Sequence, residues 1–269
     1  MKAQLSVASR PETAELTRAV VASLPQSFSL AAGDATLADV TVIGGARGWA
    51  STASHLIAAG AERVIVIDPR ADDPSAIGGV AALADSVGTR VVLSEPFAGN
   101  AGLAAAASSF SGSALISIVG LVTGDLDENL LTHLRLARLA GLADVSIGDT
   151  RTTERARLST ATARLGDSST IVRSLLARSL AAPASHTIRG YAGDRMIVAT
   201  VFDGDTARPA LVTVTSDEGA MLLPTVYESA HRTAFRSLLS EAVSTEVVRS
   251  FAIDVETASS VTGDRRARR

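Results

Sequence analysis

Two side chains of this sequence are candidates for acid–base chemistry, Asp68 and His133. Asp68 follows the apolar run RVIVI, and His133 lies in the segment NLLTHLRLARLAG. A carboxylate at the end of a strand can be tuned by burial into a general base, and a neutral histidine suits proton transfer near pH 7. Each residue also has a structural interpretation. Asp68 can cap a helix from the turn DPRADDP, and His133 can be a packed or surface residue of a leucine-rich helix.

Two turns are candidates for holding a phosphate. Gly44, Gly45 and Gly48 lie in IGGARGW, between a predicted strand and a predicted helix, where backbone N–H groups can hold an anion. Arg10 follows the first predicted strand, in ASRPET, and its guanidinium can pair with a phosphate. The alternative interpretation for both is an ordinary strand-to-helix turn without a ligand.

Composition narrows the class of function. The 269 residues contain no cysteine, which excludes disulfides, thiolate catalysis and cysteine-ligated metals. No group of His, Asp and Glu has the spacing of a metal site, so we predict no metal. A net charge of −3 does not indicate a nucleic-acid partner, and no apolar stretch is long enough to indicate a membrane partner. The N-terminal stretch lacks the pattern of a secretory leader, so we expect a cytoplasmic location.

The elements that must position these residues change character along the chain. Up to Phe97, predicted strands alternate with helices, which indicates βαβ units and a doubly wound parallel sheet. After it, a helix, a strand and an amphipathic helix lead into strands separated by turn residues, and two helices follow. We therefore predict an α/β protein with a Rossmann-like domain over residues 1–97. A mostly antiparallel α+β domain covers residues 98–269 and ends in a solvated basic tail over 263–269.

This order of elements resembles the Gfo/Idh/MocA family of oxidoreductases. The resemblance implies a Rossmann domain that binds NAD or NADP, and a C-terminal open sheet that covers the active site and often forms the oligomer interface. The segment VIVIDPRADDPSAIGG looks like the one that carries a Glu-Lys-Pro motif in the family. By that match Asp68 takes the position of the lysine, which helps to polarise the reacting group, so the charge is reversed. Glu95, Pro96 and Phe97 fall at a later turn.

A second stretch of the resemblance is the helix that carries an Asp-x-x-x-His motif in the family. His133 takes the position of the histidine, which is a proton-relay residue in many members. Asn129 takes the position of the aspartate, and Leu136 lies where a second aspartate is common. The resemblance thus implies a catalytic set of His133, Asp68 and Asn129, with two of the family's charged groups altered.

The dinucleotide loop is the third point of comparison. If LSVAS is the first Rossmann strand, Ala8, Arg10 and Thr13 stand where the family has the three glycines of its dinucleotide fingerprint. Those glycines allow a tight turn, the approach of the backbone to the pyrophosphate and close packing of the helix, so side chains at these positions would intrude on the phosphate path. Asp34 lies where an acid would bond the ribose hydroxyls. The next crossover helix and strand of the family are missing in this register. In the other register LSVASR is the second strand and the first βα unit is absent. We prefer the former, since losing an edge strand costs less packing.

Two functional hypotheses follow. In the first, the chain is a divergent relative whose NAD(P) binding is impaired or lost. It then acts as a non-catalytic ligand-binding or assembly partner, as a homo-oligomer or with an intact paralogue through the C-terminal sheet. In the second, it is an NAD(P)-dependent oxidoreductase that transfers hydride to or from a sugar-like or related polar hydroxyl or carbonyl substrate. The altered glycines and the acid at Asp68 favour the first hypothesis.

Overall fold

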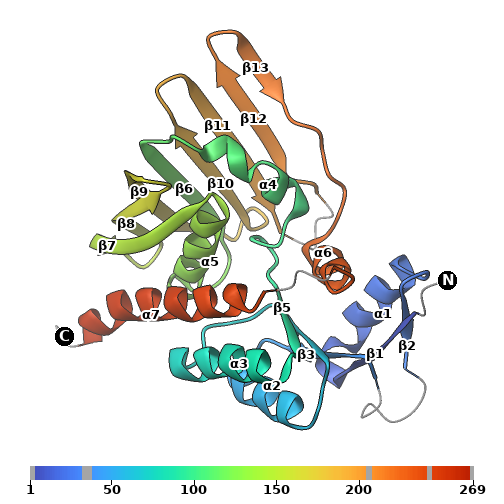
Figure 1. Cartoon of the computed structure of the whole chain (residues 1–269). Helices are drawn as coiled ribbons and strands as arrows, with labels where there is room; N and C mark the ends of the chain where they lie inside the picture. The colour runs from blue at the N-terminus through green and yellow to red at the C-terminus, as the bar shows by residue number, and fades with distance from the viewer. Residues whose placement is uncertain (1–3, 32–37, 204–207, 241–243, 267–269) are drawn as a thin grey trace. The chain divides into compact units, whose positions relative to one another are not determined.

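The computed structural model describes residues 4–31, 38–203, 208–240 and 244–266. The chain divides into two compact units. The first unit comprises Met1–Glu95 together with Ala230–Val255, and the second comprises Pro96–Ser229 with Glu256–Arg269. The sequence analysis places all of residues 98–269 in one domain, whereas here residues 230–255 group with the N-terminal sheet (Figure 1).

The first unit is built on a parallel sheet of five strands in the order β2-β1-β3-β4-β5. Its strands are β1 (Leu5–Ser9), β2 (Phe28–Leu30), β3 (Val40–Gly44), β4 (Arg63–Ile67) and β5 (Arg90–Ser94). Its helices are η1 (Pro11–Thr13), α1 (Ala14–Ser23), α2 (Trp49–Ala58), α3 (Pro74–Val87), α6 (Ala230–Ser237) and the first part of α7 (Glu246–Arg266). This is the six-stranded dinucleotide-binding order with one strand missing. The order fits both registers considered from the sequence, because the missing strand can be an edge strand beyond β2 or a strand between β1 and β3.

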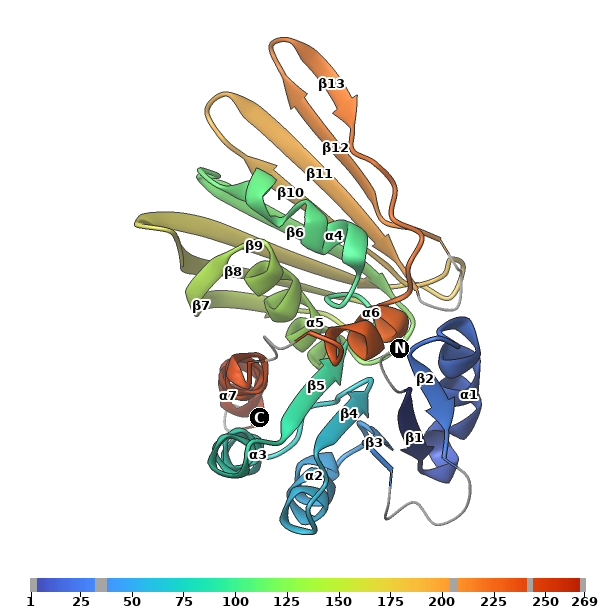
Figure 2. The same ribbon diagram turned by 45° about the vertical axis from the view of Figure 1, so that its right-hand side comes forward.

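Burial explains why these segments form strands. Val64, Ile65 and Val66 of β4 are completely buried, as expected of a central parallel strand covered on both faces. Helix α2 packs against α3, and α1 packs against α6. Figure 2 shows α2 and α3 side by side beneath the strands.

Aromatic contacts explain why residues 230–255 belong to the first unit. Phe235 of α6 meets Phe28 of β2 edge to face, with ring centroids 5.5 Å apart. Phe251 of α7 meets Trp49 of α2 in the same way at 6.1 Å. All four rings are at least 98% buried, so α6 and the start of α7 complete the core of the parallel sheet. The predicted domain boundary misses this packing, because residues 230–255 are far in sequence from the strands and helices that they contact.

The second unit is an eight-stranded sheet in the order β13-β12-β11-β10-β6-β9-β8-β7. Its strands are β6 (Leu115–Val122), β7 (Leu142–Thr152), β8 (Ala156–Leu165), β9 (Ser168–Arg178), β10 (Ser185–Tyr191), β11 (Arg195–Phe202), β12 (Leu211–Ser216) and β13 (Gly219–Leu222). Its helices are α4 (Ala101–Ala105), η3 (Ala107–Phe110) and α5 (Leu126–Leu139). Only β6 and β9 pair in parallel. The predicted mostly antiparallel sheet is therefore confirmed.

One face of this sheet is covered by helices. Helix α5 begins at Asp125, whose carboxylate accepts hydrogen bonds from the N–H groups of Asp127 and Glu128. Leu136 and Ala137 of α5 join the buried core on that face.

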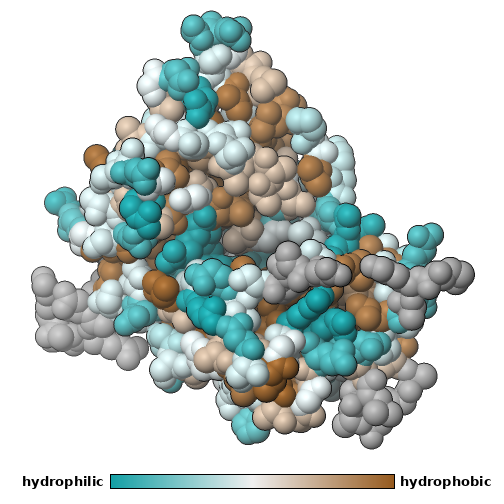
Figure 3. All heavy atoms as spheres, viewed as in Figure 1, coloured by the Kyte–Doolittle hydropathy of each residue, from teal (hydrophilic) through white to brown (hydrophobic). Residues whose placement is uncertain are grey.

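Hydrophilic residues gather over the tip of the β12–β13 hairpin at the top of Figure 3. None of the helices in the described part of the chain is long and apolar enough to cross a membrane.

Candidate functional site

The turn between β1 and α1 is closed by its own hydrogen bonds. The Arg10 N–H donates to the Val42 carbonyl oxygen, and the Thr13 N–H donates to that of Arg10, both at 3.1 Å. The Ala14 N–H donates to the Pro11 carbonyl oxygen, and Pro11 itself has no N–H. A dinucleotide loop instead leaves such N–H groups facing the pyrophosphate. In this turn, by contrast, the N–H groups of Arg10, Thr13 and Ala14 bond to carbonyl oxygens of the chain.

The side chains of Glu12 and Thr13 lie beside the crevice between β1 and β3. The chain passes from β1 to β2 on one side and returns to β3 on the other, so this is the switch point where ligands bind in such sheets. A Cβ atom added at Gly44 would lie 3.0 Å from Glu12 Cγ and 3.7 Å from Thr13 Cγ2. Glu12 therefore lies against the end of β3. Its negative charge there opposes the approach of a pyrophosphate.

The other predicted cofactor residues on β1 and β2 contribute little to such a site. Ala8 is 7% exposed within β1 and pairs in register with Thr41 of β3, so it belongs to the sheet. Arg10 is exposed, and its backbone N–H donates to the Val42 carbonyl oxygen. Asp34, predicted to hold the ribose, lies outside the described residues.

Gly45 is required by packing. A Cβ atom added there would lie 2.4 Å from Pro69 Cα and 2.5 Å from the Asp68 carbonyl oxygen. The Gly45 N–H donates to the Ile67 carbonyl oxygen at 2.7 Å, and the Arg70 N–H donates to that of Gly45 at 2.8 Å. The glycine thus lets the turn after β3 lie directly on the turn after β4.

The start of α2 already holds a carboxylate. Gly48 adopts a left-handed backbone, with φ of 85°, and begins α2. Asp72 Oδ2 accepts hydrogen bonds from the N–H groups of Gly48, at 2.9 Å, and Ala50, at 3.2 Å. This is the position in which a glycine-rich turn would bind an external anion. Here the anion is the carboxylate of Asp72, which belongs to the loop between β4 and α3.

Two other aspartates cap the helices on either side of Asp68. Asp73 caps α3, accepting a hydrogen bond from the Ser75 N–H, and Asp72 caps α2. Asp68 itself has a left-handed backbone, with φ of 50°, which is uncommon for a residue other than glycine. Its carboxylate lies 3.8 Å from His231 Nε2, and His231 Nδ1 lies 2.7 Å from Ser94 Oγ. Sequence reasoning did not select His231, because nothing local to its helix marks it.

His133 lies in a sealed polar group inside the second unit. It is 2% exposed on α5, its Nδ1 lies 2.7 Å from Ser174 Oγ, and its Nε2 lies 3.0 Å from Nδ1 of His186. A Cβ atom added at Gly120 would come within 2.7 Å of both imidazoles. The ring of Phe97 meets His186 edge to face at 4.4 Å. Gly120 and Phe97 thus enclose the pair.

Burial sets the protonation of this pair. It lowers the pKa of His186 to about 4, and burial with the neighbouring His186 lowers the pKa of His133 well below its usual value. Both rings are neutral at pH 7. Beside His133 lies a cavity of about 20 Å³, lined by Ser159, Ser174 and aliphatic side chains, which has room for one water molecule. The geometry is that of a buried structural network rather than of a relay open to a substrate.

Asn129 contributes to the first turn of α5. Its Nδ2 donates to the Asp125 carbonyl oxygen at 2.7 Å, so the amide closes the start of the helix rather than reaching His133 one turn later. The structure places His133 and Asn129 in the second unit and Asp68 in the first. In the described part of the chain, no three His, Asp or Glu side chains are grouped for a metal ion.

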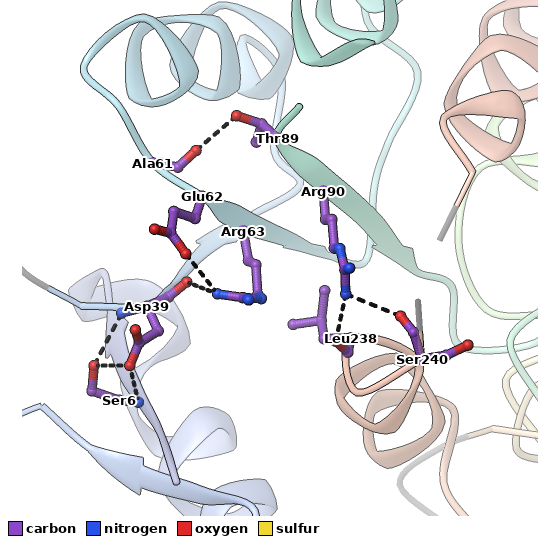
Figure 4. Close-up of polar contacts among 9 residues, drawn as sticks. All are labelled: Ser6, Asp39, Ala61, Glu62, Arg63, Thr89, Arg90, Leu238 and Ser240. Carbon is purple, nitrogen blue, oxygen red and sulfur yellow. Dashed lines mark hydrogen bonds and ion pairs between the residues drawn. The ribbon is translucent and has the colours of Figure 1, made fainter. Parts of the chain in front are cut away.

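A hollow of about 550 Å³ lies at the opposite, amino-terminal edge of the parallel sheet, between the ends of α2 and α3 and the starts of β4 and β5. Figure 4 shows the polar network around it. Arg63 donates to Glu62 and to the Asp39 carbonyl oxygen, and Arg90 donates to the carbonyl oxygens of Leu238 and Ser240. These bonds fix strand starts and the end of α6. Ligands of such sheets bind at the carboxyl edge, so this hollow is not the cofactor site.

Comparisons with known proteins define the fold class. A scan of family models and a search of curated proteins give no match. Solved structures match over nearly the whole chain. A dehydrogenase (MviM) from Clostridium difficile has a TM-score of 0.73 at 9% identity, covering 97% of this chain and 100% of that one. An oxidoreductase from Sinorhizobium meliloti has 0.72 at 10%, covering 95% and 96%.

A third structure carries a ligand. A variant of KijD10, a 3-ketoreductase from Actinomadura kijaniata in complex with TDP-benzene and NADP, has a TM-score of 0.66 at 12% identity, covering 96% of each chain. These matches show that the chain shares its fold with solved oxidoreductases and dehydrogenases. This chain has the fold of the Gfo/Idh/MocA-type oxidoreductases, as the sequence resemblance predicts.

Proposed function

We propose that this chain keeps the Gfo/Idh/MocA scaffold but has impaired or lost NAD(P) binding, and acts as a non-catalytic ligand-binding or assembly partner. The carrying observation is the β1–α1 turn. Its N–H groups at Arg10, Thr13 and Ala14 bond within the protein, and Glu12 lies against Gly44 in the crevice. These N–H groups are therefore engaged within the chain, and the Glu12 carboxylate would repel a pyrophosphate that approached the crevice.

Two further observations support the proposal. Asp68, which takes the place of the family's lysine in the sequence match, reverses the charge that would polarise a reacting hydroxyl or carbonyl. His133, at the proton-relay position, is enclosed with Ser174 and His186. A loop change alone is compatible with an active enzyme. Loss of the loop, the lysine and an accessible relay together fits a chain that no longer transfers hydride.

The proposal is tested by titrating the purified chain with NADH and NADPH, followed by calorimetry and fluorescence. We expect no binding up to millimolar concentrations. Glu12→Gln should leave binding undetectable, because the closed backbone remains. The double variant Pro11→Gly with Glu12→Gly, which restores an N–H and opens the crevice, should bind more tightly than wild type. Glu15→Gln, which removes an equal charge one turn along α1, is the matched control.

The second hypothesis remains an NAD(P)-dependent oxidoreductase acting on a sugar-like or related polar hydroxyl or carbonyl substrate. It is favoured by one finding, that the structures sharing this fold are named as dehydrogenases and reductases, one of them with NADP bound. Micromolar binding of NADH or NADPH by the wild-type chain would decide for this hypothesis and against the first. In that case His133→Ala should reduce turnover with little effect on cofactor affinity.

Assembly is proposed through the uncovered face of the eight-stranded sheet. Ile116, Ile118 and Val172 point to the core beneath α5, so alternate positions on these strands point the other way. Leu115, Ile171, Tyr191 and Met196 lie in one register row across β9, β6, β10 and β11. Ile171 is 58% exposed and Tyr191 is 36% exposed. We call this row and its face the open face.

An apolar row across four central strands, with Ile171 and Tyr191 exposed, favours a protein partner, and a second copy of the chain presents the same face by symmetry. Sedimentation analysis should therefore show concentration-dependent self-association. Ile171→Glu should shift the chain to monomer. Val87→Glu, at an equally exposed apolar position of α3 in the first unit, should not. A wild-type chain that stays monomeric at every concentration would leave self-association without support.

A further inference from the structure

Two arginines lie side by side where two neighbouring strands of the parallel sheet begin. Arg63 is the first residue of β4 and Arg90 is the first residue of β5, and the two are register partners. Register partners on neighbouring strands point to the same face of a sheet. Figure 4 shows both side chains extending from the strand starts on one side. Because like charges this close repel each other, the pair does not stabilise the sheet, and it favours an anionic ligand instead.

The main chain holds the guanidinium group of Arg90 in place. Its Nη1 donates to the carbonyl oxygens of Leu238, at 3.2 Å, and Ser240, at 3.0 Å. Both acceptors are uncharged, so these bonds fix the position of the group without compensating its positive charge. A guanidinium group has five N–H donors, and in the described part of the chain the bonds of Arg90 leave from Nη1 alone. Its Nε and Nη2 groups remain as donors for a ligand.

Arg63 carries a buried donor, its Nε, that has no hydrogen-bond partner among the described residues. A buried donor in that state costs free energy, which an oxygen acceptor on the same side of the guanidinium group would recover. The Nη1 of Arg63 donates to Glu62 Oε2 at 3.0 Å and to the Asp39 carbonyl oxygen at 3.5 Å. The Glu62 side chain is 72% exposed, so its ion pair with Arg63 contributes little and can give way to a ligand.

The hollow of about 550 Å³ at this edge of the sheet is lined by both arginines. Its volume is in the range of small-molecule sites and far exceeds the volume of one water molecule. The C-terminal ends of α2 and α3 also line it, and the carbonyl groups of helix ends carry partial negative charge. An anionic group is therefore expected beside the arginines, with the uncharged part of the ligand towards the helix ends.

We propose that this hollow, the amino-edge site, binds a small organic phosphate whose phosphate group is held by Arg63 and Arg90. A phosphate monoester carries a charge of about −1.5 to −2 at pH 7, which two guanidinium groups match. The paired N–H groups of arginine suit phosphate oxygens. The hollow is larger than a free phosphate ion, so it also has room for the organic part. The inference goes beyond the proposed function, because it holds whether or not the chain binds a dinucleotide.

The test is nuclear magnetic resonance on the full chain labelled with ¹⁵N-arginine, which reports on the Nε–H group of each arginine. Glycerol 3-phosphate should shift the Arg63 and Arg90 signals in a saturable way and should bind more tightly than inorganic phosphate. Glycerol should not shift them, because it carries no charge. Arg151, an exposed arginine of β7, is the internal reference and should not shift. Unmoved Arg63 and Arg90 signals, equal shifts at Arg151, or equal affinity for inorganic phosphate would each overturn the proposal.

Variants separate the site from general folding effects. Arg63→Gln and Arg90→Gln each remove one positive charge and should weaken glycerol 3-phosphate binding at least about tenfold. Glu62→Gln keeps both arginines and removes a competing carboxylate, so binding should become about two- to fivefold tighter. Arg151→Gln, which removes an equal charge from β7, is the matched control and should bind like wild type.

Wild-type affinity in Arg63→Gln and Arg90→Gln would refute the site. Unchanged affinity in Glu62→Gln would refute it as well, and this variant keeps the test valid if an arginine variant fails to fold. Titration of the same samples with NADH reports separately on the proposed function.

Discussion

At the scale of single residues, Gly120 shows how closely the second unit is packed. The nearest atoms to a Cβ atom added there belong to His133, His186 and Leu176, at 2.7–2.9 Å. We expect Gly120→Ala to lower the free energy of unfolding by about 1–3 kcal/mol, the usual cost of overpacking a core. Urea denaturation measures this. Gly193→Ala, at an open position in the turn after β10, is the control and should be near neutral.

The buried pair of His133 and His186 predicts that the free energy of unfolding depends on pH. Histidine in the unfolded chain has a pKa near 6.5, whereas burial lowers the pKa of His186 to about 4. Between these values the unfolded chain binds the proton and the folded chain does not. The stability is therefore fully present above about pH 6.5 and falls as the pH drops towards 4, by about 3 kcal/mol for His186 alone.

Denaturation at several pH values measures that slope. His186→Asn keeps a hydrogen-bond acceptor for His133 but removes one titrating ring, so the loss of stability below pH 6.5 should become smaller. His55→Gln alters an exposed histidine and should keep the wild-type slope. An unchanged slope in His186→Asn would mean that other groups, such as carboxylates, control the acid sensitivity.

At the scale of elements, hydrogen bonds join the loops that follow β3 and β4 at the carboxyl edge of the parallel sheet. Asp72 caps α2 from the loop that leads to α3. Asp72→Ala should destabilise the chain by about 1 kcal/mol, the typical loss of a helix cap. Thermal denaturation reports the loss. Asp167→Ala, in the exposed turn between β8 and β9, is a matched control for the removed charge.

The strands and helices could be predicted from the sequence because their signals are local. The apolar run of β4 and the leucine pattern of α5 belong to this class. The contacts of Glu12 with Gly44, and of His231 with Ser94, join residues that no local pattern links. The Asp-x-x-x-His motif predicts His133 as a proton-relay residue. The sequence does not show that His186, 53 residues later, lies against its ring.

At the scale of the whole molecule, the chain returns to the first unit at residue 230, after forming the sheet of the second. Phe235 and Phe251 supply rings to the first core. A chain ending at residue 229 should therefore lose the cooperative unfolding of the first unit. Hydrogen exchange should show faster exchange of β1 and β2 amides in that truncated chain. Unchanged protection would mean that the parallel sheet folds without α6 and α7.

The carboxylate of Asp72 at the start of α2 has a consequence for how the chain responds to its surroundings. A protein that relies on an outside anion gains stability only in proportion to the logarithm of that anion's concentration over its dissociation constant. Here the anion is covalently part of the chain and accompanies every folded copy. The stability that this cap gives to the start of α2 should accordingly be the same at every concentration of phosphate or other anions in the surrounding solution.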